Sequence, residues 1–312
     1  MKALVTGASG FVGKHLVEHL LSCGDEVALA DRVECESSSS KAQSFSADIL
    51  DLEDCRKTVF ESEPDVIYHL AGIAFMPQAE KDFNQVLRIN VGGVYNMLSA
   101  ANDYQLKTGK VLKFILVSSG QVYGKSKDIP VTENTAVVPA NNYSLSKTLA
   151  EDVVLRFSDN KNLKVVIARP LNHIGPGQNS RFVVSNFAKQ LIDIKNNKSE
   201  PRMMVGNLTA ERDFTDVRDI VRAYRIIAEK AQSGVFNLCS GAPVSIQSIL
   251  DLLVEQADVE VNIEQDPDRM RPSEVPVMYG SYEKALSELG WRPEITLRES
   301  LLDVLNWVKQ NG

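Results

Sequence analysis

The stretch Thr6-Gly7-Ala8-Ser9-Gly10-Phe11-Val12-Gly13 decides the fold of this chain. It follows a short apolar run, Ala3–Thr6, and opens a segment of helical periodicity that ends at Gly24. Three glycines spaced three apart at a strand-to-helix turn let a pyrophosphate approach the backbone N–H groups at the helix N-terminus, where a Cβ atom would block it. The stretch therefore predicts a dinucleotide-binding turn, with GxxGxxG spacing in place of the commoner GxGxxG.

Residues at the ends of other predicted strands extend this cofactor site. Asp31 stands 18 residues after Gly13, where an acid hydrogen-bonds the adenine ribose and repels a 2′-phosphate. It favours NADH over NADPH, but only modestly, because Arg32 follows at once. Asp48 either reaches the adenine or caps the next helix, and Gly72 either lies beside the cofactor or serves a turn. The predicted contacts are Gly7, Gly10, Phe11, Val12, Gly13, Asp31, Arg32, Asp48, Ile49, Leu70, Ala71 and Gly72.

Short apolar runs alternate with helical segments through the first half of the chain. Such nearly continuous runs are typical of parallel strands buried on both faces, and strand alternating with helix predicts an α/β fold, a Rossmann-type doubly wound parallel sheet. The predicted strands are Ala3–Thr6, Val27–Ala30, Val66–Leu70, Phe114–Ser118 and Val165–Ala168, and the helices between them include Leu52–Glu61, Phe83–Lys107 and Asn142–Phe157.

After Pro170 the pattern loosens into a segment rich in Gly, Pro and Asn. The remainder mixes helices with two predicted strands, Val235–Cys239 and Val259–Gln265. We therefore predict an NAD(P)-binding domain over residues 1–170 and a smaller C-terminal α/β substrate domain over residues 171–312. Residues from about 208 to 240 are expected to return to the first domain.

Charge and hydropathy exclude several classes of protein. The chain has 34 basic and 41 acidic side chains, a formal net charge of −7, so nucleic acid is not an expected partner. Its longest uncharged stretch, residues 231–250, is interrupted by polar residues and does not resemble a membrane span of ~20 apolar residues. We expect a cytoplasmic protein without membrane contact. His15 and His19 have no third ligand and are interpreted as a solvated helix face, so no metal is expected.

Three residues form a candidate catalytic set. Tyr143 and Lys147 are four apart on one predicted helix, so their side chains point the same way. Ser119 follows a predicted strand at the sheet edge where open α/β folds bind ligands. A phenol with an ordinary pKa of about 10 is a poor proton shuttle at neutral pH, and we expect the ammonium group of Lys147 to lower the pKa of Tyr143. Ser119 is expected to hydrogen-bond the substrate oxygen or the tyrosine.

With these features in this order, the whole sequence resembles the extended, nucleotide-sugar-modifying branch of the short-chain dehydrogenases/reductases. The resemblance implies that Ser119, Tyr143 and Lys147 are catalytic and that Lys147 also holds the nicotinamide ribose. It implies that Asn90 supports the site, which adds Asn90, Tyr143 and Lys147 to the expected cofactor contacts. It also implies a homodimer formed through the long helices around residues 84–102 and 143–157.

The residues after Ser119 limit the expected chemistry. In the 4,6-dehydratase family, carboxylates at this place remove the C5 proton and expel the C6 hydroxyl, whereas this chain has Gly120 and Gln121, which cannot do that work. In the GDP-fucose synthase family a Cys and a His perform the epimerisation, and Gln121 and Gly177 stand at the matching places here. Two reactions remain, which are ketone reduction and C4 epimerisation through a transient ketone.

Motifs in the second half resemble the GDP-4-dehydro-6-deoxy-D-mannose reductase family. They are Arg169–Gln178, Phe187–Gln190, Val205–Leu208, Arg212–Asp219 and Arg271–Pro276. The resemblance implies reduction of the C4 ketone of GDP-4-dehydro-6-deoxy-D-mannose by NAD(P)H to GDP-6-deoxy-D-mannose, also called GDP-D-rhamnose. The implied substrate contacts are Ser119, Gly120, Gln121, Asn172, Phe182, Val183, Lys189, Arg212, Arg271, Pro272, Ser273 and Glu274.

Alternatives stay open at this point. A nucleotide-sugar 4-epimerase with tightly bound NAD uses the same catalytic residues, and so does a reductase that forms the GDP-6-deoxy-D-talose epimer. A sensor that binds the cofactor without catalysis has no use for an intact proton donor. Arg212 either contacts the substrate or pairs with Asp213 near a helix capped by Thr215. His173 lies near the sugar either as a packed loop residue or as a catalytic one.

Overall fold

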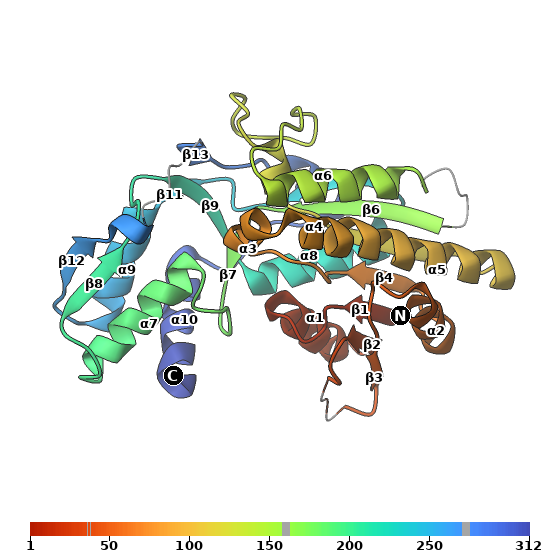
Figure 1. Ribbon diagram of the computed structural model, residues 1–312, viewed down its shortest axis with the longest axis horizontal. Coiled ribbons are helices and arrows are strands. Elements are labelled where there is room, and N and C mark those ends of the chain that lie inside the picture. The colour runs from red at the N-terminus through yellow and green to blue at the C-terminus, as the bar shows by residue number, and fades with distance from the viewer. Residues whose placement is uncertain (36, 38, 158–162, 270–274) are drawn as a thin grey trace.

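A seven-stranded sheet forms the centre of the computed structural model, which describes residues 1–35, 37, 39–157, 163–269 and 275–312 (Figure 1). Every strand pair in it is parallel, and the order is β10-β6-β5-β4-β1-β2-β3. The predicted Rossmann-type fold is confirmed. The strands are β1 Lys2–Thr6, β2 Glu26–Asp31, β3 Ala42–Ser46, β4 Val66–His69, β5 Leu112–Val117, β6 Leu163–Pro170 and β10 Gly234–Leu238.

Helices cover both faces of this sheet. Strands that are apolar on both faces need such cover, because each face must be buried. One face is covered by α1 (Phe11–Ser22) and α8 (Val217–Lys230), which share a core cluster with β1, β2 and β10. The other is covered by α2 (Leu52–Ser62), α5 (Gly93–Thr108) and α6 (Asn142–Leu155). The strand order reverses between β1 and β4, so the crevice at their carboxyl ends is the expected ligand site.

The helix predicted over Phe83–Lys107 is present over almost that range, but it contains a π-helical turn that was not predicted. The structure divides it into α4 (Phe83–Leu87), a π-helical turn (Arg88–Gly92) and α5. A separate short helix, α3 (Met76–Lys81), precedes it with Pro77 in its first turn. The π turn inserts an extra residue into the helical repeat, and such turns are frequent at functional sites. Here the turn contains Asn90, which it directs into the protein interior.

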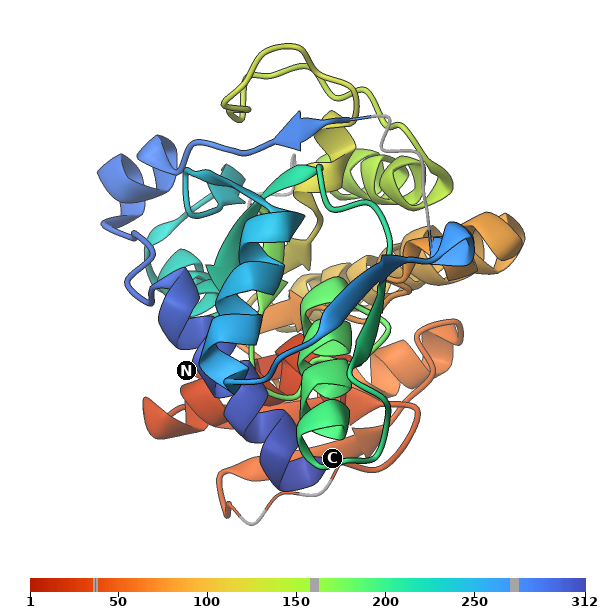
Figure 2. The same cartoon turned by 90° about the vertical axis from the view of Figure 1, so that its left-hand side faces the viewer.

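Most of the chain after Pro170 forms a second lobe, at the left of Figure 1 and facing the viewer in Figure 2. Its helices α7 (Val183–Lys195), α9 (Ile246–Ala257) and α10 (Leu297–Asn311) pack around a separate core. Its strands are β7 Asn172–Ile174, β8 Arg202–Val205, β9 Glu211–Asp216, β11 Pro243–Ser245, β12 Asn262–Gln265 and β13 Val277–Met278. Short 3-10 turns at Gly120–Tyr123 and Pro267–Arg269 and a π turn at Ala285–Leu289 complete the elements.

The chain crosses between the two lobes more than once. After β9, helix α8 packs on α1, and β10 joins the central sheet beside β6. The division at residue 170 stays a prediction, although β6 ends at that residue and β7 begins the second lobe's strand pairing with β9. Among the described residues, no helix is long and apolar enough to cross a membrane.

Candidate active site

The glycine turn brings the backbone of β1, α1 and the segment after β4 into close contact. Gly7 has a positive φ of 71°, and its N–H donates to the carbonyl of Ala30 at 2.9 Å. A Cβ atom on Gly7 would lie 2.9 Å from the backbone nitrogen of Ala71, and one on Gly13 would lie 2.2 Å from the carbonyl oxygen of Gly7. Gly10 precedes α1 and offers no side-chain cap to its first turn. The N–H groups of the first turn of α1 therefore lack a side-chain cap from Gly10, and such a helix N-terminus favours an anion.

Asp31 lies at the carboxyl end of β2, directly beside this turn. Its Oδ2 accepts hydrogen bonds from the backbone N–H of Ser9 at 3.1 Å and from the Ser9 hydroxyl at 2.6 Å. These bonds fix the carboxylate at the edge of the glycine turn. Arg32, next along the chain, is exposed.

Asp48 is not a helix cap, contrary to one sequence interpretation. Its Oδ1 accepts from the N–H of Leu50 at 2.9 Å, while Asp51 caps α2 through the N–H groups of Glu53 and Asp54. Ile49 packs closely on Gly93. A Cβ atom on Gly93 would lie 2.4 Å from the Cδ1 atom of Ile49.

The segment after β4 is bonded on one side to the residue before the glycine turn and on the other, through Asn90, to α6. The N–H of Ala71 donates to the Thr6 hydroxyl at 3.3 Å. Asn90, which is buried, accepts from the N–H of Ile73 at 2.8 Å and donates to its carbonyl at 3.0 Å. The same amide donates to Ser146 on α6 at 3.0 Å. Asn90 thus ties this segment to the helix of Tyr143, and its role in supporting the active site stays a prediction.

The three predicted catalytic residues meet at the carboxyl edge of the sheet. Tyr143 and Lys147 lie on α6, whose N-terminus is capped by Asn141, and each is only 8% exposed. The Tyr143 hydroxyl hydrogen-bonds to Ser119, which stands just after β5. The ammonium of Lys147 donates to the carbonyl of Val117 at 2.9 Å.

The expected effect of Lys147 on the pKa of Tyr143 is not what the structure gives. Burial raises the pKa of Tyr143, and the hydrogen bond from Ser119, not the Lys147 charge, opposes that rise. Burial also lowers the pKa of Lys147 to about 8, against the charge of Glu151. The physical reason is that desolvation penalises both charged forms more than these neighbours compensate. Tyr143 is therefore protonated at neutral pH and suited to donate a proton.

The segment from Ile73 to Glu80 holds the start of α6, the helix of Tyr143, and sequence patterns do not reveal this contact. Ile73 and Phe83 pack against Tyr143 in one small cluster. The carboxylate of Glu80 on α3 accepts from the backbone N–H of Asn142 at 2.9 Å and from its side-chain amide at 3.0 Å. Glu80 gives no signal in the sequence, because its partner is 62 residues away.

The second lobe contributes the predicted substrate residues in different ways. Asn172 is partly buried and donates to the carbonyl of Asp213 at 3.0 Å. Arg212 donates to the carbonyls of Glu211 and Pro276, at 2.7 and 3.1 Å, and burial lowers its pKa. Lys189 is exposed and pairs at 2.8 Å with Asp193 on its own helix, and its predicted contact with the GDP portion stays a prediction.

The alternative reading of Arg212 and Asp213 as an ion pair is also wrong. Asp213 is fully buried and accepts from the N–H and hydroxyl of Ser240, at 2.6 and 2.7 Å, and from the N–H of Gly241 at 2.9 Å. Asp216, not Thr215, caps α8. Asp213 thus joins β9 to the loop after β10.

Gly120 and Gln121 form the turn that follows Ser119. A Cβ atom on Gly120 would lie 2.7 Å from the side chain of Leu171, and the N–H of Gln121 donates to the Ser119 hydroxyl at 3.2 Å. A side chain at this position would therefore have to displace the Leu171 side chain. The predicted residues Arg271, Pro272, Ser273 and Glu274 lie outside the described residues.

Aromatic contacts connect the two lobes on either side of the crevice. Phe75, in the segment after β4, makes an edge-to-face contact with Phe182 at 5.9 Å between ring centroids, and the guanidinium of Arg181 lies 5.7 Å from the Phe75 ring. Val183, the first residue of α7, follows Phe182 and is exposed. Phe75 and Arg181 were not predicted, since contacts between lobes leave no periodic signal.

On the other side of the crevice, Phe11 at the start of α1 stacks on His173 at 6.3 Å. Val12 packs on the core cluster of that face. The Nδ1 of His173 donates to the Leu171 carbonyl at 3.1 Å, and burial lowers the pKa of the imidazole, so a packed loop histidine is the better description. His15 packs on Phe11 and contacts the Pro176 carbonyl at 2.8 Å, so it is not part of a solvated face.

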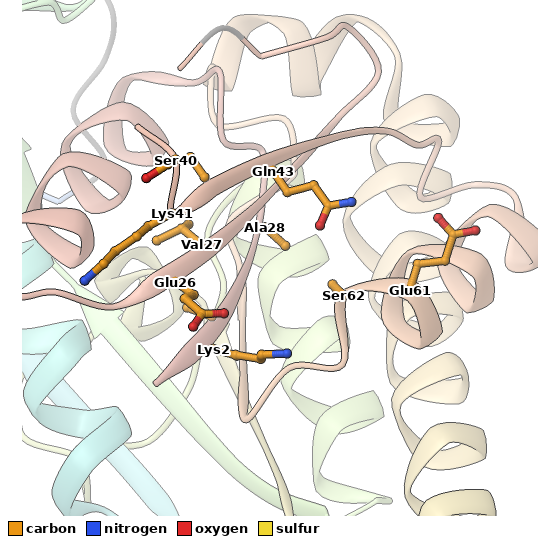
Figure 3. Close-up of a pocket in the computed structure, with 11 residues that line it drawn as sticks. Lys2, Glu26, Val27, Ala28, Ser40, Lys41, Gln43, Glu61 and Ser62 are labelled. Carbon is orange, nitrogen blue, oxygen red and sulfur yellow. The ribbon is translucent and has the colours of Figure 1, made fainter. Parts of the chain in front are cut away.

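Figure 3 shows a pocket of about 260 Å³ that lies away from these residues. It is lined by the first residues of β1, β2 and β3 and therefore lies at the opposite edge of the parallel sheet. Its lining carries charges of both signs, from Lys2, Lys41, Glu26 and Glu61 (Figure 3). It takes no part in the site at the carboxyl edge. The described residues contain no group of His, Cys, Asp and Glu that could hold a metal.

Comparisons with known proteins agree with this fold. A family model described as GDP-mannose 4,6 dehydratase matches residues 4–304. GDP-6-deoxy-D-mannose reductase of Pseudomonas aeruginosa is 35% identical over 98% of this chain and 96% of its own length. GDP-6-deoxy-D-talose 4-dehydrogenase of Aggregatibacter actinomycetemcomitans is 29% identical over 93% of this chain and 92% of its own. The solved structure of RMD from Pseudomonas aeruginosa, complexed with NADPH, has a TM-score of 0.88 at 33% identity and covers 100% of both chains.

Proposed function

We propose, because the chain belongs to the GDP-mannose 4,6-dehydratase family of extended short-chain dehydrogenases/reductases, that it reduces the C4 ketone of GDP-4-dehydro-6-deoxy-D-mannose with NAD(P)H to GDP-6-deoxy-D-mannose. The observation that supports this most is the hydrogen-bonded Ser119–Tyr143 pair one helical turn from Lys147, at the sheet edge that also holds the glycine turn. Likeness over nearly the full length to a reductase of this substrate class points the same way.

The residues at the glycine turn fit a dinucleotide. Gly7 and Gly13 let β1, α1 and the segment after β4 pack closely, because a Cβ atom on either glycine would meet backbone atoms at 2.9 and 2.2 Å. The N-terminus of α1 is thereby held at the carboxyl edge of the sheet, where its N–H groups would meet a pyrophosphate. Asp31 is fixed beside the turn, where an acid would reach a ribose hydroxyl. Lys147, in its charged form below about pH 8, would hold the nicotinamide ribose. When bound, NAD(P)H supplies the hydride for the carbonyl carbon.

The chain's own residues handle the oxygen of the ketone. Tyr143 is protonated at neutral pH because burial raises its pKa, so it donates its proton to the oxygen at C4 as negative charge develops there. Ser119 donates a second hydrogen bond to the same oxygen, and this preorganised pair stabilises the transition state. Dehydration, the reaction in the family's name, has no support, because Gly120 and Gln121 stand where it needs carboxylates.

An assay with the 4-keto sugar tests this function directly. Purified protein is mixed with GDP-4-dehydro-6-deoxy-D-mannose, formed in situ from GDP-mannose by a dehydratase, and oxidation of NADH or NADPH is followed by absorbance and the product by NMR. We expect stoichiometric oxidation with GDP-6-deoxy-D-mannose as product. No oxidation, together with NAD released only on denaturation, would instead support a nucleotide-sugar 4-epimerase.

A second candidate product is GDP-6-deoxy-D-talose, the C4 epimer. The 29% identity to a GDP-6-deoxy-D-talose 4-dehydrogenase favours it. Both products use the same proton donor, because the outcome depends on which face of the sugar ring meets the cofactor. The NMR spectrum of the product distinguishes the two, since H4 is axial in one epimer and equatorial in the other.

Asp31 is expected to set the preference for NADH over NADPH. We expect Asp31→Asn to raise the ratio of kcat/KM for NADPH to that for NADH by about tenfold, the factor given by ~1.4 kcal/mol of relieved repulsion with a 2′-phosphate. Asparagine keeps an oxygen for the Ser9 hydrogen bonds. Arg32→Gln is the matched variant and should lower the ratio. An unchanged ratio in Asp31→Asn contradicts the assignment.

The proposed use of NADH or NADPH also supports a cytoplasmic location of the protein.

The homodimer expected from the resemblance is proposed to form through α5 and α6. These helices pack side by side (Figure 1), and exposed apolar side chains gather on them, namely Tyr95, Leu106, Leu145, Leu149 and Leu155. We expect Leu149→Glu to halve the mass measured by sedimentation, because an unpaired charge at an apolar interface is costly. Leu302→Glu, at an exposed leucine of α10, is the control and should leave the mass unchanged. A dimeric Leu149→Glu protein would exclude this surface.

A further inference from the structure

A chain of buried polar side chains lies directly behind the catalytic residues. Glu151, on α6 one turn after Lys147, accepts two hydrogen bonds from Arg169 on β6, from Nε to Oε1 at 3.0 Å and from Nη2 to Oε2 at 2.6 Å. It also accepts from the hydroxyl of Ser118, the residue before Ser119. The Nη1 of Arg169 donates to the hydroxyl of Tyr123 at 3.0 Å, which donates to Asn237 on β10 at 2.6 Å.

This pair is an unusual way to fill a protein interior. Glu151 is 4% exposed and Arg169 is 6% exposed. Removing two charges from water costs about as much as their attraction returns, so a buried ion pair is weak support for stability alone. Its bidentate geometry and the bonds to Ser118 and Tyr123 satisfy most of its polar atoms. Such a network is expected to specify one arrangement of the elements that it joins.

The elements joined are those that hold the proposed catalytic residues. Ser118 fixes the end of β5 immediately before Ser119. Tyr123 belongs to the 3-10 turn that begins after Ser119, and the Arg169 guanidinium lies 5.0 Å from its ring centroid. Glu151 shares a face of α6 with Lys147. The network therefore touches the Ser119 turn on both sides and the catalytic helix at one point.

We propose that the Glu151–Arg169 pair is the positioning element of this active site, holding the Ser119 turn in register with the Tyr143–Lys147 helix. Both residues are buried and hydrogen-bonded to other side chains of the protein. The pair acts through Ser118 and Tyr123 on Ser119, and through the carboxylate charge on Lys147. The inference rests on the proposed reductase function only where it is tested by kcat.

The Glu151–Arg169 pair also affects the charge of Lys147. Burial lowers the pKa of Lys147, and the Glu151 carboxylate opposes that fall. The other groups facing Lys147 carry no charge at neutral pH, because His69 is buried with a pKa of about 3 and Tyr143 is protonated. Glu151 is thus the acidic group that keeps Lys147 charged. Its removal is expected to lower the pKa of Lys147 further.

The test compares Glu151→Gln with the wild type by two readouts. NMR titration of lysine labelled at the ε carbon, with Lys147 assigned through Lys147→Arg, measures the pKa of Lys147 without any substrate. We expect the pKa to fall in Glu151→Gln. We also expect kcat to fall about 10- to 100-fold, as small misplacements of reacting groups cause, with KM for the GDP-sugar nearly unchanged.

Two further variants separate geometry from charge. Arg169→Lys keeps the positive charge but loses the fork-like donors, so kcat should fall while the pKa of Lys147 stays near its wild-type value. Asp219→Asn is the matched control, because Asp219 is also a buried acid, pairs with Arg222 at 2.8 Å and lies on α8. It should lower the melting temperature but change neither kcat nor the pKa of Lys147.

The results test the positioning role of the Glu151–Arg169 pair separately from the proposed reductase activity. If Glu151→Gln behaves like Asp219→Asn, the pair is only structural and the proposal is overturned. If Glu151→Gln does not fold, Ser118→Ala takes its place, since it removes one donor to Glu151, and an unchanged kcat there overturns the proposal. If the wild type does not reduce the 4-keto sugar, the proposed function fails, and the titration of Lys147 still decides whether Glu151 controls its charge.

Discussion

Tyr143→Phe is expected to lower kcat by about 10²- to 10⁴-fold, the usual contribution of a positioned proton donor. The variant removes one oxygen atom, the one that hydrogen-bonds to Ser119 and would protonate the developing alkoxide. The ring keeps its packing against Ala79 and Val86, so the fold should hold. Steady-state kinetics should show the loss in kcat, while calorimetry should show a Kd for the GDP-sugar close to that of the wild type.

Tyr68→Phe is the matched control for this loss. Tyr68 lies on β4, is fully buried, and its hydroxyl has no hydrogen-bond partner among the described residues. Removing that hydroxyl should leave kcat unchanged and stability equal or higher, since an unsatisfied buried hydroxyl is costly. Wild-type turnover in Tyr143→Phe would refute the assignment of the proton donor.

The parts of the fold and site that were predictable from the sequence are those with a local signal. Strands β1, β2, β4, β5 and β6 are nearly continuous apolar runs, whereas β3 is mostly polar. The glycine turn and the spacing of Tyr143 and Lys147 are likewise visible within a few residues of sequence. The helix over 83–107 was predicted as one element, because a π turn leaves the apolar pattern almost intact while it redirects Asn90 inward.

The parts that were missed depend on which elements pack together. Glu151 and Arg169 are 18 residues apart and meet only because α6 lies on β6. Phe75 and Phe182 meet across the two lobes. The pKa of Tyr143 was expected to fall because a charge stands nearby, but the sequence does not reveal burial, and here burial is the larger effect.

Gly13→Ala is expected to abolish most cofactor binding without touching a residue that contacts the substrate. The added Cβ atom would lie 2.2 Å from the carbonyl oxygen of Gly7 and 2.8 Å from the Cα of Ala8, both of them backbone atoms that no side-chain rotation can move. Helix α1 must then shift away from the turn whose N–H groups are proposed to bind the pyrophosphate. Overpacking of this kind costs roughly 1–3 kcal/mol, so the melting temperature should fall as well.

Fluorescence titration of NADH and NADPH measures this effect, and we expect each Kd to weaken by about 10- to 100-fold. Gly92→Ala is the control, because a Cβ atom on Gly92 meets nothing within 4 Å and its φ of −62° suits alanine. That variant should bind both cofactors as the wild type does and be slightly more stable, since alanine restricts the unfolded chain. A Gly13→Ala protein with wild-type Kd values would mean that α1 adapts to the added methyl group, and that close approach of the helix to the turn is not what binds the dinucleotide.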